Sequence, residues 1–224
     1  MIKCVIFDLD DTLYNERTYV ESAMHNVAEY LSDKFGLNNQ EIYGKLIKIL
    51  DSEGRGHIFD VCIAEYGIDE KVSKLVQVYR DTKPQLKLYE DSSKLIQVLK
   101  DRHIKTAIIT DGCSKVQHNK ITALNLDKII DEIIVTDDYE GAAKPSTVPY
   151  EMVLLKMHDI EADKCIYIGD NPTKDFIGAG KMGMQTARII RNAGDYMKLQ
   201  AEEGFEADIT IHNLMEIADY LKKI

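Results

Sequence analysis

Two aspartates near the start of the chain, Asp8 and Asp10, have the spacing at which a pair of carboxylates can do chemistry. They follow residues 5–7, an apolar run of the kind found in a strand that is buried on both faces. Open α/β sheets bind ligands at the carboxyl ends of their strands, so both side chains are expected to face one pocket. Two carboxylates this close repel each other unless a cation lies between them, and Mg²⁺ is the usual cation beside phosphate. One carboxylate could then attack as a nucleophile while the other transfers protons.

A helix N-terminus is the alternative interpretation of the same stretch. Asp11 or Thr12 would cap the helix that follows, and the other acidic side chains would be solvated. Residues 8–12 alone leave both interpretations open.

Two further segments could contact an anion. Thr110-Asp111-Gly112 follows an apolar run, and its hydroxyl and backbone amides suit a phosphate oxygen. A Thr-Asp-Gly turn is also a common way to leave a strand. Lys144 precedes Pro145, which fixes the backbone there, so its ammonium could be held against a carboxylate or a phosphate. A solvated lysine is the alternative.

A fourth polar segment begins at Gly169, which lets the backbone approach a ligand closely. Asp170 follows and could complete the oxygen ligands of a metal ion; the alternative is an N-cap for the next helix. Asp175 and Asn171 are expected to orient the residues that touch the metal or the substrate. Asp175 could equally be an ordinary acidic residue in the first turn of a helix.

Apolar runs alternate with helical patterns along most of the chain, which predicts an α/β fold with a doubly wound, Rossmann-like parallel sheet. After the first strand, the predicted strands cover 105–110, 132–136, 165–169, 185–190 and 209–211. The predicted helices of this part cover 90–102, 114–124, 149–157, 173–182 and 214–223.

The second strand begins only at Lys105, although a simple crossover needs about a dozen residues. Apolar residues at helical spacing fill the gap in four groups, interrupted near Gly36, Gly54 and Gly67. We therefore expect a four-helix inserted domain at 16–84, and a catalytic core formed by 1–15 and 85–224.

The composition is that of a globular protein, with 45% hydrophobic and 29% charged residues. The net charge of −10 argues against nucleic acid or an anionic membrane as the main partner. The four cysteines are scattered, no apolar run approaches a membrane span, and the N-terminus lacks a signal pattern. We expect reduced thiols and a cytoplasmic protein.

All four polar segments follow strands, so they should meet at one edge of the sheet, which independent helix caps have no reason to do. The constellation resembles the haloacid dehalogenase superfamily of hydrolases over nearly the whole chain. Asp8-x-Asp10-x-Thr12 is similar to its first motif, Thr110 to its second, Lys144 to its third and Gly169-Asp170-x-x-x-x-Asp175 to its fourth. The insertion is similar to the family's first type of cap domain. The Asp-Asp-Thr-Leu-Tyr and Thr-Asp-Gly stretches are similar to the subgroup that holds sugar-phosphate phosphatases and nucleotidases.

The resemblance implies a role for each matching residue. Asp8 would be the nucleophile that forms an aspartyl-phosphate, and Asp10 the general acid and then the general base. Thr110 would bind the transferring phosphoryl group, and Lys144 would neutralise charge on Asp8 and the phosphate. Mg²⁺ would be held by Asp8, Asp170 and the backbone carbonyl of Asp10.

The expected activity is Mg²⁺-dependent hydrolysis of a small phosphomonoester by a monomer or homodimer. A dehalogenase does not need the second acid, Asp10, so that activity is disfavoured. A phosphomutase, or a non-catalytic protein that binds a phospholigand, stays open. Specificity should lie in the insertion, where Arg55 between two glycines could bind an anion, unless this is a solvated turn. Tyr14 borders the entry to the insertion and is expected to act as a hinge or a substrate contact.

Overall fold

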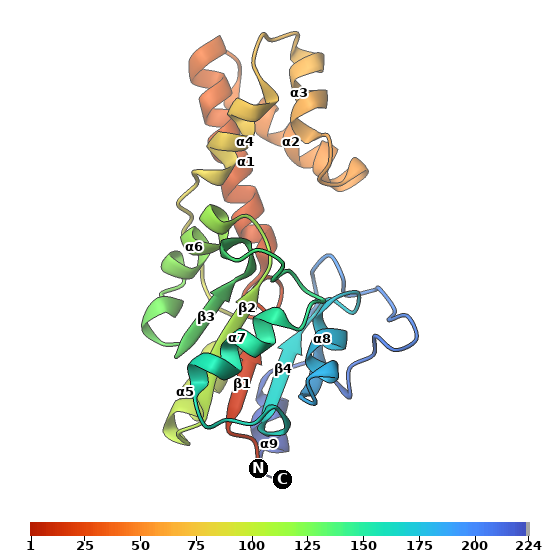
Figure 1. The fold of residues 1–224 in the computed structure, drawn as a ribbon. Helices are drawn as coiled ribbons and strands as arrows, with labels where there is room; N and C mark the ends of the chain where they lie inside the picture. Colours follow the sequence, from red (N-terminus) through yellow and green to blue (C-terminus); the bar gives the residue numbers. More distant parts are fainter. Residues whose placement is uncertain (223–224) are drawn as a thin grey trace. The chain divides into compact units, whose positions relative to one another are not determined.

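The computed structural model describes residues 1–222, and the chain divides into two compact units. The core unit combines Met1–Glu16 with the chain from Leu86 onward, and the helical unit is Arg17–Gln85. These bounds differ by one residue from those expected from the sequence. In Figure 1 the helical unit is the orange and yellow part of the chain.

A sheet of six parallel strands forms the centre of the core unit, as the sequence predicts (Figure 1). The strands are β1 (Cys4–Phe7), β2 (Lys105–Thr110), β3 (Glu132–Val135), β4 (Cys165–Gly169), β5 (Gln185–Ile189) and β6 (Ile209–Ile211). Their order is β3-β2-β1-β4-β5-β6. Every residue of β1 is buried, because helices cover both faces of the sheet.

The helices of the core unit are α5 (Glu90–Asp101), α6 (Ser114–Ala123), α7 (Val148–Met157), α8 (Asp175–Lys181) and α9 (Met215–Tyr220). One-turn helices lie at Leu126–Lys128, Thr136–Asp138 and Ala162–Lys164. On one face, α7 packs on β2 and β3, and α8 packs on β4 and β5. Ile6, Ala107 and Tyr167 point into this layer. Their sequence neighbours point to the opposite face, where α5 contacts β2 and packs against α9.

Predicted and observed elements differ mainly at helix ends. The helix predicted at 173–182 begins at Asp175, because the Asn171 side chain accepts hydrogen bonds from the amide and hydroxyl of Thr173 and forms a turn first. The predicted closing helix reached Lys223, which lies outside the described residues. All four cysteines are free thiols, with Cys4 and Cys165 buried in the sheet.

The helical unit consists of α1 (Glu16–Phe35, whose first residue belongs to the core unit), α2 (Asn39–Glu53), α3 (Ile58–Tyr66) and α4 (Val72–Arg80). Within this unit α2 packs on α3, and α3 packs on α4. Asn38 caps α2 by accepting hydrogen bonds from two amides of its first turn. Along the described chain, no helix combines the length and the apolar character needed to cross a membrane.

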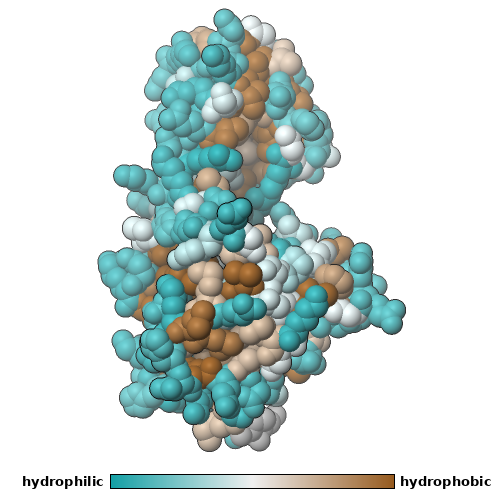
Figure 2. All heavy atoms as spheres, in the orientation of Figure 1, coloured by the Kyte–Doolittle hydropathy of each residue, from teal (hydrophilic) through white to brown (hydrophobic). Residues whose placement is uncertain are grey.

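A strip of apolar side chains, flanked by hydrophilic ones, is exposed on the helical unit (Figure 2). This unit contains a hollow of about 290 Å³ with an apolar lining that includes Val20, Met24 and Phe59. Arg55 and Arg80 also line the hollow. Asp60 is a further lining residue, so the recess combines apolar walls with charged side chains of both signs.

Candidate active site

The predicted catalytic residues lie where the strand order reverses. From β1 the chain builds β2 and β3 on one side and then returns to place β4 on the other side. Ligands of open α/β sheets bind at this switch point, beyond the carboxyl ends of the strands. The amide of Asp8 donates to the carbonyl of Ile168 at 2.7 Å, so strand pairing continues up to the first of the predicted catalytic aspartates. Asp8 is therefore held by the backbone of the sheet itself.

The ammonium of Lys144 lies between two carboxylates, and its side chain is fully buried. Its Nζ atom is 2.5 Å from Oδ1 of Asp8 and 2.6 Å from Oδ1 of Asp175, and it donates to the hydroxyl of Tyr167 at 2.8 Å. Burial by itself lowers the pKa of Lys144, but Asp175 and Asp8 outweigh it and hold that pKa well above its usual range. Lys144 is therefore a fixed positive charge beside Asp8.

Asp8 is in an environment that disfavours its charge. Burial raises the pKa of Asp8 to about 7, against the opposing effect of Lys144. A second cation beside this carboxyl group would favour the ionised form, which is the form that can attack an electrophile.

Asp10 is surrounded by hydrogen-bond donors. Its Oδ1 atom accepts from the hydroxyl of Tyr14 at 2.6 Å and from Nζ of Lys120 at 2.7 Å, and its Oδ2 atom accepts from the amide of Gln117 at 2.9 Å. Burial opposes ionisation, but Lys120 and these hydrogen bonds lower the pKa of Asp10 below its usual value. Tyr14, expected as a hinge or substrate contact, thus contacts a predicted catalytic residue directly.

The N-cap interpretation is correct for Asp11 and wrong for its two acidic neighbours. Oδ1 of Asp11 accepts a hydrogen bond from the amide of Glu16, the first residue of α1, at 2.9 Å. Its other oxygen accepts from the amide of Asp195 at 3.2 Å. Asp11 adopts the left-handed conformation with φ of 53°, which aspartate tolerates better than most residues. Asp8 and Asp10 are paired with lysines and are not solvated acids.

The loop after β2 brings Thr110 to the same place. The Thr110 hydroxyl accepts from Nε2 of Gln117 at 2.5 Å, so one amide group links it to Asp10. Gly112 has φ of 129°, and a Cβ atom there would lie 3.2 Å from Cδ of Gln117. Glycine at this position therefore leaves room for Gln117.

Asp111, predicted as a substrate contact, binds other parts of the protein. Its carboxylate accepts from the hydroxyl of Thr136 at 2.8 Å, from the backbone amide of Lys144 at 3.2 Å and from Nζ of Lys174 at 2.8 Å. Burial works against the charge, but Lys144 and Lys174 lower the pKa of Asp111. The side chain joins the loops that follow β2, β3 and β4, which is a positioning role.

Asp170 has the properties expected of a cation ligand. Its Oδ2 atom is buried and has no hydrogen-bond partner among residues 1–222. Burial and the negative charges of Asp8 and Asp175 raise the pKa of Asp170 to about 9. Ionising a buried carboxyl group beside another carboxyl group is unfavourable when no cation is present. A divalent cation that binds the oxygen without a partner makes the ionised form favourable. The donor set therefore fits Mg²⁺.

Across the described chain, no three Asp, Glu, His or Cys side chains are arranged to hold a metal ion. Two carboxylates suffice, because Mg²⁺ in phosphate sites is commonly held by one or two of them, with waters and substrate oxygens completing its shell. Asp8 and Asp170, with the backbone carbonyl of Asp10, remain the predicted ligands.

Asp175 and Asn171 hold the loop after β4. Oδ2 of Asp175 accepts from the backbone amide of Asn171 at 2.8 Å, while Oδ1 binds Lys144. A Cβ atom on Gly169 would collide with the Asp175 carboxylate. Asp175 therefore orients Lys144, and the absence of a side chain at Gly169 makes room for it.

Sequence reasoning missed four polar side chains of this site. Lys120 and Gln117 bind Asp10, Lys174 binds Asp111, and the Tyr167 hydroxyl binds Lys144. Lys120 and Gln117 are three positions apart and thus lie on one face of α6, which is the one signal the sequence offers for them. Arg55 belongs to the helical unit, where it is exposed and lines the hollow of that unit.

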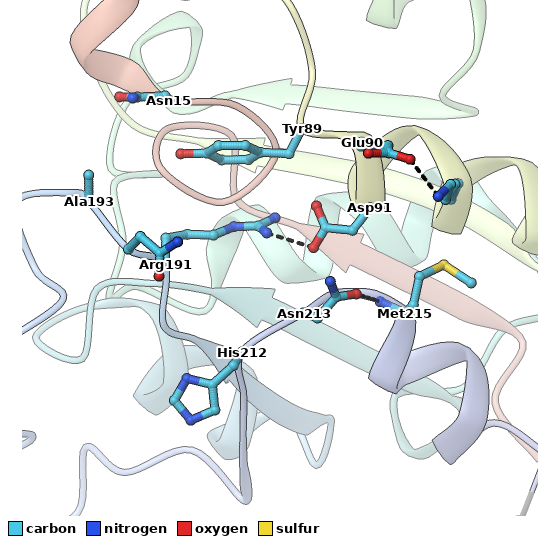
Figure 3. A pocket seen from close by; sticks show the side chains of 11 residues that line it. Asn15, Tyr89, Glu90, Asp91, Arg191, Ala193, His212, Asn213 and Met215 are labelled. Atoms are coloured by element: carbon cyan, nitrogen blue, oxygen red, sulfur yellow. Dashed lines mark hydrogen bonds and ion pairs between the residues drawn. The ribbon is translucent and has the colours of Figure 1, made fainter.

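A hollow of about 450 Å³ in the core unit lies beside the loop that follows β1 (Figure 3). Arg191 lines it together with Tyr89, whose ring centre is 4.2 Å from the guanidinium carbon. The Arg191 guanidinium also binds Asp91 at 2.6 Å and the carbonyl of Thr12 at 2.7 Å. None of the predicted catalytic residues lines this hollow. Through its hydrogen bond to the Thr12 carbonyl, Arg191 holds the loop that also contains Asp10.

Comparisons with known proteins identify the family of the chain. The sequence pattern described as haloacid dehalogenase-like hydrolase matches residues 5–189. The chain is 32% identical to the glyceraldehyde 3-phosphate phosphatase of Methanocaldococcus jannaschii, over 100% of this chain and 99% of that protein. It is 28% identical to the enzyme of the same name from Pyrococcus furiosus, over 99% of this chain and 94% of that protein.

Solved structures show the same fold. A HAD phosphatase from Thermococcus onnurineus superimposes with a TM-score of 0.63 at 25% identity, covering 98% of each chain. The HAD-hydrolase YfnB from Bacillus subtilis, solved with bound magnesium, gives a TM-score of 0.71 at 21% identity and covers 98% of each chain. With its family pattern, its full-length relatives and its fold in agreement, the chain belongs to the haloacid dehalogenase-like hydrolases.

Proposed function

We propose that the chain is a Mg²⁺-dependent phosphatase that hydrolyses a small sugar-phosphate monoester through an aspartyl-phosphate on Asp8. The observation that carries this proposal is the buried arrangement of Asp8, Lys144 and Asp170, in which one carboxyl group faces a fixed ammonium and its neighbour has an unpartnered oxygen. The full-length relatives named glyceraldehyde 3-phosphate phosphatase support a three-carbon sugar phosphate as the substrate class.

In the first half-reaction the Asp8 carboxylate attacks phosphorus, and the bond between phosphorus and the alcohol oxygen breaks. Asp10 donates a proton to that oxygen, so the product leaves as a neutral alcohol. Lys144 and the Thr110 hydroxyl bind the oxygens of the transferring group, whose charge must be neutralised for transfer to occur. Mg²⁺, when bound by Asp8, Asp170 and the Asp10 carbonyl, supplies further charge neutralisation.

In the second half-reaction water attacks phosphorus of the aspartyl-phosphate. Asp10 now accepts the proton of the water, the bond between phosphorus and the Asp8 oxygen breaks, and inorganic phosphate is released. The overall result is one phosphomonoester and one water converted to an alcohol and phosphate.

The test is release of inorganic phosphate from a panel of sugar phosphates and nucleotides, with Mg²⁺ and with EDTA. We expect release from a subset of the panel that includes glyceraldehyde 3-phosphate, and loss of release in EDTA. Asp8→Asn should abolish turnover and leave the protein folded, whereas the surface variant Asp163→Asn should match the wild type. Transfer of phosphate between two positions of a sugar without release would instead identify a mutase, and binding without either reaction would identify a phospholigand-binding protein.

We also propose that the helical unit is the cap of this enzyme and that Arg55 contributes to specificity. The guanidinium group of Arg55 is suited to binding an anionic group, and Arg55 lines the recess of the helical unit. Arg55→Ala should raise KM for the true substrate with little change in kcat, while Lys71→Ala, an exposed change in the same unit, should alter neither. Unchanged kinetics in Arg55→Ala would remove Arg55 from substrate recognition.

A further inference from the structure

Lys120 is a lysine in an unusual place. It lies on α6, the helix that follows the loop of Thr110, outside the residues that match the family motifs, and its side chain is only 2% exposed. Its Nζ atom is 2.7 Å from Oδ1 of Asp10 and 3.4 Å from Oε1 of Glu16. A lysine is almost never this buried unless it is paired, so the pairing with these two carboxylates explains how the charge is tolerated.

Gln117 lies on the same face of α6, one turn before Lys120. Its side-chain nitrogen donates both to Oδ2 of Asp10 at 2.9 Å and to the hydroxyl of Thr110 at 2.5 Å. The two oxygens of Asp10 are thus held by different residues of one helix, Oδ1 by Lys120 and Oδ2 by Gln117. Both rotation about the terminal bond of Asp10 and displacement of the carboxyl group are restricted.

This arrangement has a consequence for proton transfer. A general acid must lie within hydrogen-bond distance of the oxygen that receives its proton, and small displacements reduce the rate strongly. Thr110 is expected to bind the phosphoryl group, so Gln117 sets the position of Asp10 relative to that group through a single amide. Lys120 fixes the opposite side of the same carboxyl group.

We propose that Lys120 and Gln117 are positioning residues for Asp10, which fix where its carboxyl group lies when it transfers a proton to the leaving alcohol and do not contribute to substrate affinity. They do not keep Asp10 protonated, because both donate hydrogen bonds to its carboxylate oxygens and so favour the ionised form. The inference rests on the proposed phosphatase function, because it assigns Asp10 as the general acid. Neither residue touches the reacting atoms, so their effect passes entirely through Asp10.

A purely structural role is the competing explanation, in which the buried ion pair ties α6 to the loop after β1. The two explanations differ in how the loss depends on the leaving group. An alkyl phosphate needs a proton on its leaving oxygen, whereas 4-nitrophenyl phosphate releases an anion that is stable without one. Damage to the fold lowers kcat/KM for both substrates. Loss of general-acid catalysis lowers kcat/KM mainly for the alkyl phosphate, because kcat/KM reports the first half-reaction, whereas the general-base role of Asp10 belongs to the second half-reaction, which the two substrates share.

The experiment measures kcat and KM in the presence of Mg²⁺ for the wild type, Lys120→Met and Gln117→Leu. Each protein is assayed on two substrates, 4-nitrophenyl phosphate and an alkyl phosphate that the wild type hydrolyses. Glyceraldehyde 3-phosphate is the first alkyl phosphate to try. General acid catalysis contributes about 10²- to 10⁴-fold, so Lys120→Met should lower kcat/KM for the alkyl phosphate by about 100-fold, through kcat. The kcat/KM value for 4-nitrophenyl phosphate should change by less than about 5-fold, which is well below the range expected from general acid catalysis. Lys128→Met, an exposed lysine that binds Asn125, is the matched control and should behave as wild type.

Equal losses of kcat/KM on the two substrates, or no loss, would overturn the proposal. Gln117→Leu removes no charge, so it tests the same hydrogen-bond network if Lys120→Met fails to fold. It should also lower kcat/KM more for the alkyl phosphate than for the aryl phosphate, by a smaller factor than Lys120→Met. On an Asp10→Asn background, Lys120→Met should add little further loss, because residues that act through one group are not additive. A wild-type protein that hydrolyses neither substrate would refute the phosphatase function itself, which is a different result from an active wild type with insensitive variants.

Discussion

Replacing Lys144 with methionine tests what this residue contributes to the stability of the fold, separately from its proposed role in catalysis. Methionine keeps much of the aliphatic volume of lysine and removes the ammonium group. In the wild type that group contacts Asp8 at 2.5 Å, Asp175 at 2.6 Å and the Tyr167 hydroxyl at 2.8 Å, and the Lys144 side chain is fully buried. The variant therefore leaves two buried carboxyl groups near each other with no cation between them.

The size of the effect follows from the burial. Removing one partner of a buried ion pair costs about 3–5 kcal/mol of the free energy of unfolding, because an uncompensated charge stays in the interior. For a chain of this length, 1 kcal/mol corresponds to a change in Tm of about 2–4 °C. We therefore expect Lys144→Met to lower the Tm by about 6–20 °C, on the combined scale of these two estimates.

The assay is thermal unfolding followed by circular dichroism in EDTA, so that metal binding does not contribute. Lys164→Met is the control, because Lys164 forms an exposed pair with Asp163 and such pairs contribute about 0–1 kcal/mol. The double variant Lys144→Met with Asp175→Asn should recover part of the lost stability, because it removes one of the two buried carboxyl groups that have lost their cation. A Tm within about 2 °C of wild type for Lys144→Met would refute the claim that this cation compensates buried charge.

Two other predictions concern the metal and the loop after β4. Because the pKa of Asp8 is raised to about 7 and that of Asp170 to about 9, the metal-free folded chain binds more protons than the unfolded chain between about pH 4 and pH 9. Its free energy of unfolding should therefore fall as the pH rises through this range, and Mg²⁺, which must displace these protons, should bind more tightly at pH 8 than at pH 6 in a calorimetric titration. Equal affinity at the two pH values would contradict this. Gly169→Ala should lower both Tm and kcat, because the new Cβ atom would collide with the Asp175 carboxylate. Gly180→Ala has open space within helix α8, so it should lower neither Tm nor kcat.

The sheet could be predicted from the sequence because its strands are short apolar runs with few alternatives. β1, β2 and β4 combine β-branched residues with complete or nearly complete burial, which is what a parallel sheet covered on both faces requires. The start of α8 could not be predicted in the same way. It depends on which of several polar side chains near Asn171 bonds to the backbone, and composition does not distinguish between them.

The positions of the proposed catalytic aspartates could be predicted for a related reason, and the contacts around them could not. Asp8, Asp10 and Asp170 follow strands, and parallel strands end at a common edge, so sequence order alone brings them together. Lys120 reaches Asp10 from the middle of a helix, where a lysine ordinarily points to solvent. Only the packing of α6 shows that this lysine points inward.

The polar residues of the site also hold one another in place, and this affects how any variant should be interpreted. Asp175 holds Lys144 against Asp8, Gln117 links Asp10 to Thr110, and Asp111 joins three loops through its single carboxylate. Removing one member changes the position of the next, so single substitutions should overstate individual contributions, and their effects should not add. The leaving-group comparison is informative for this reason. It asks which chemical step is lost, and that answer does not depend on dividing the loss among residues that act together.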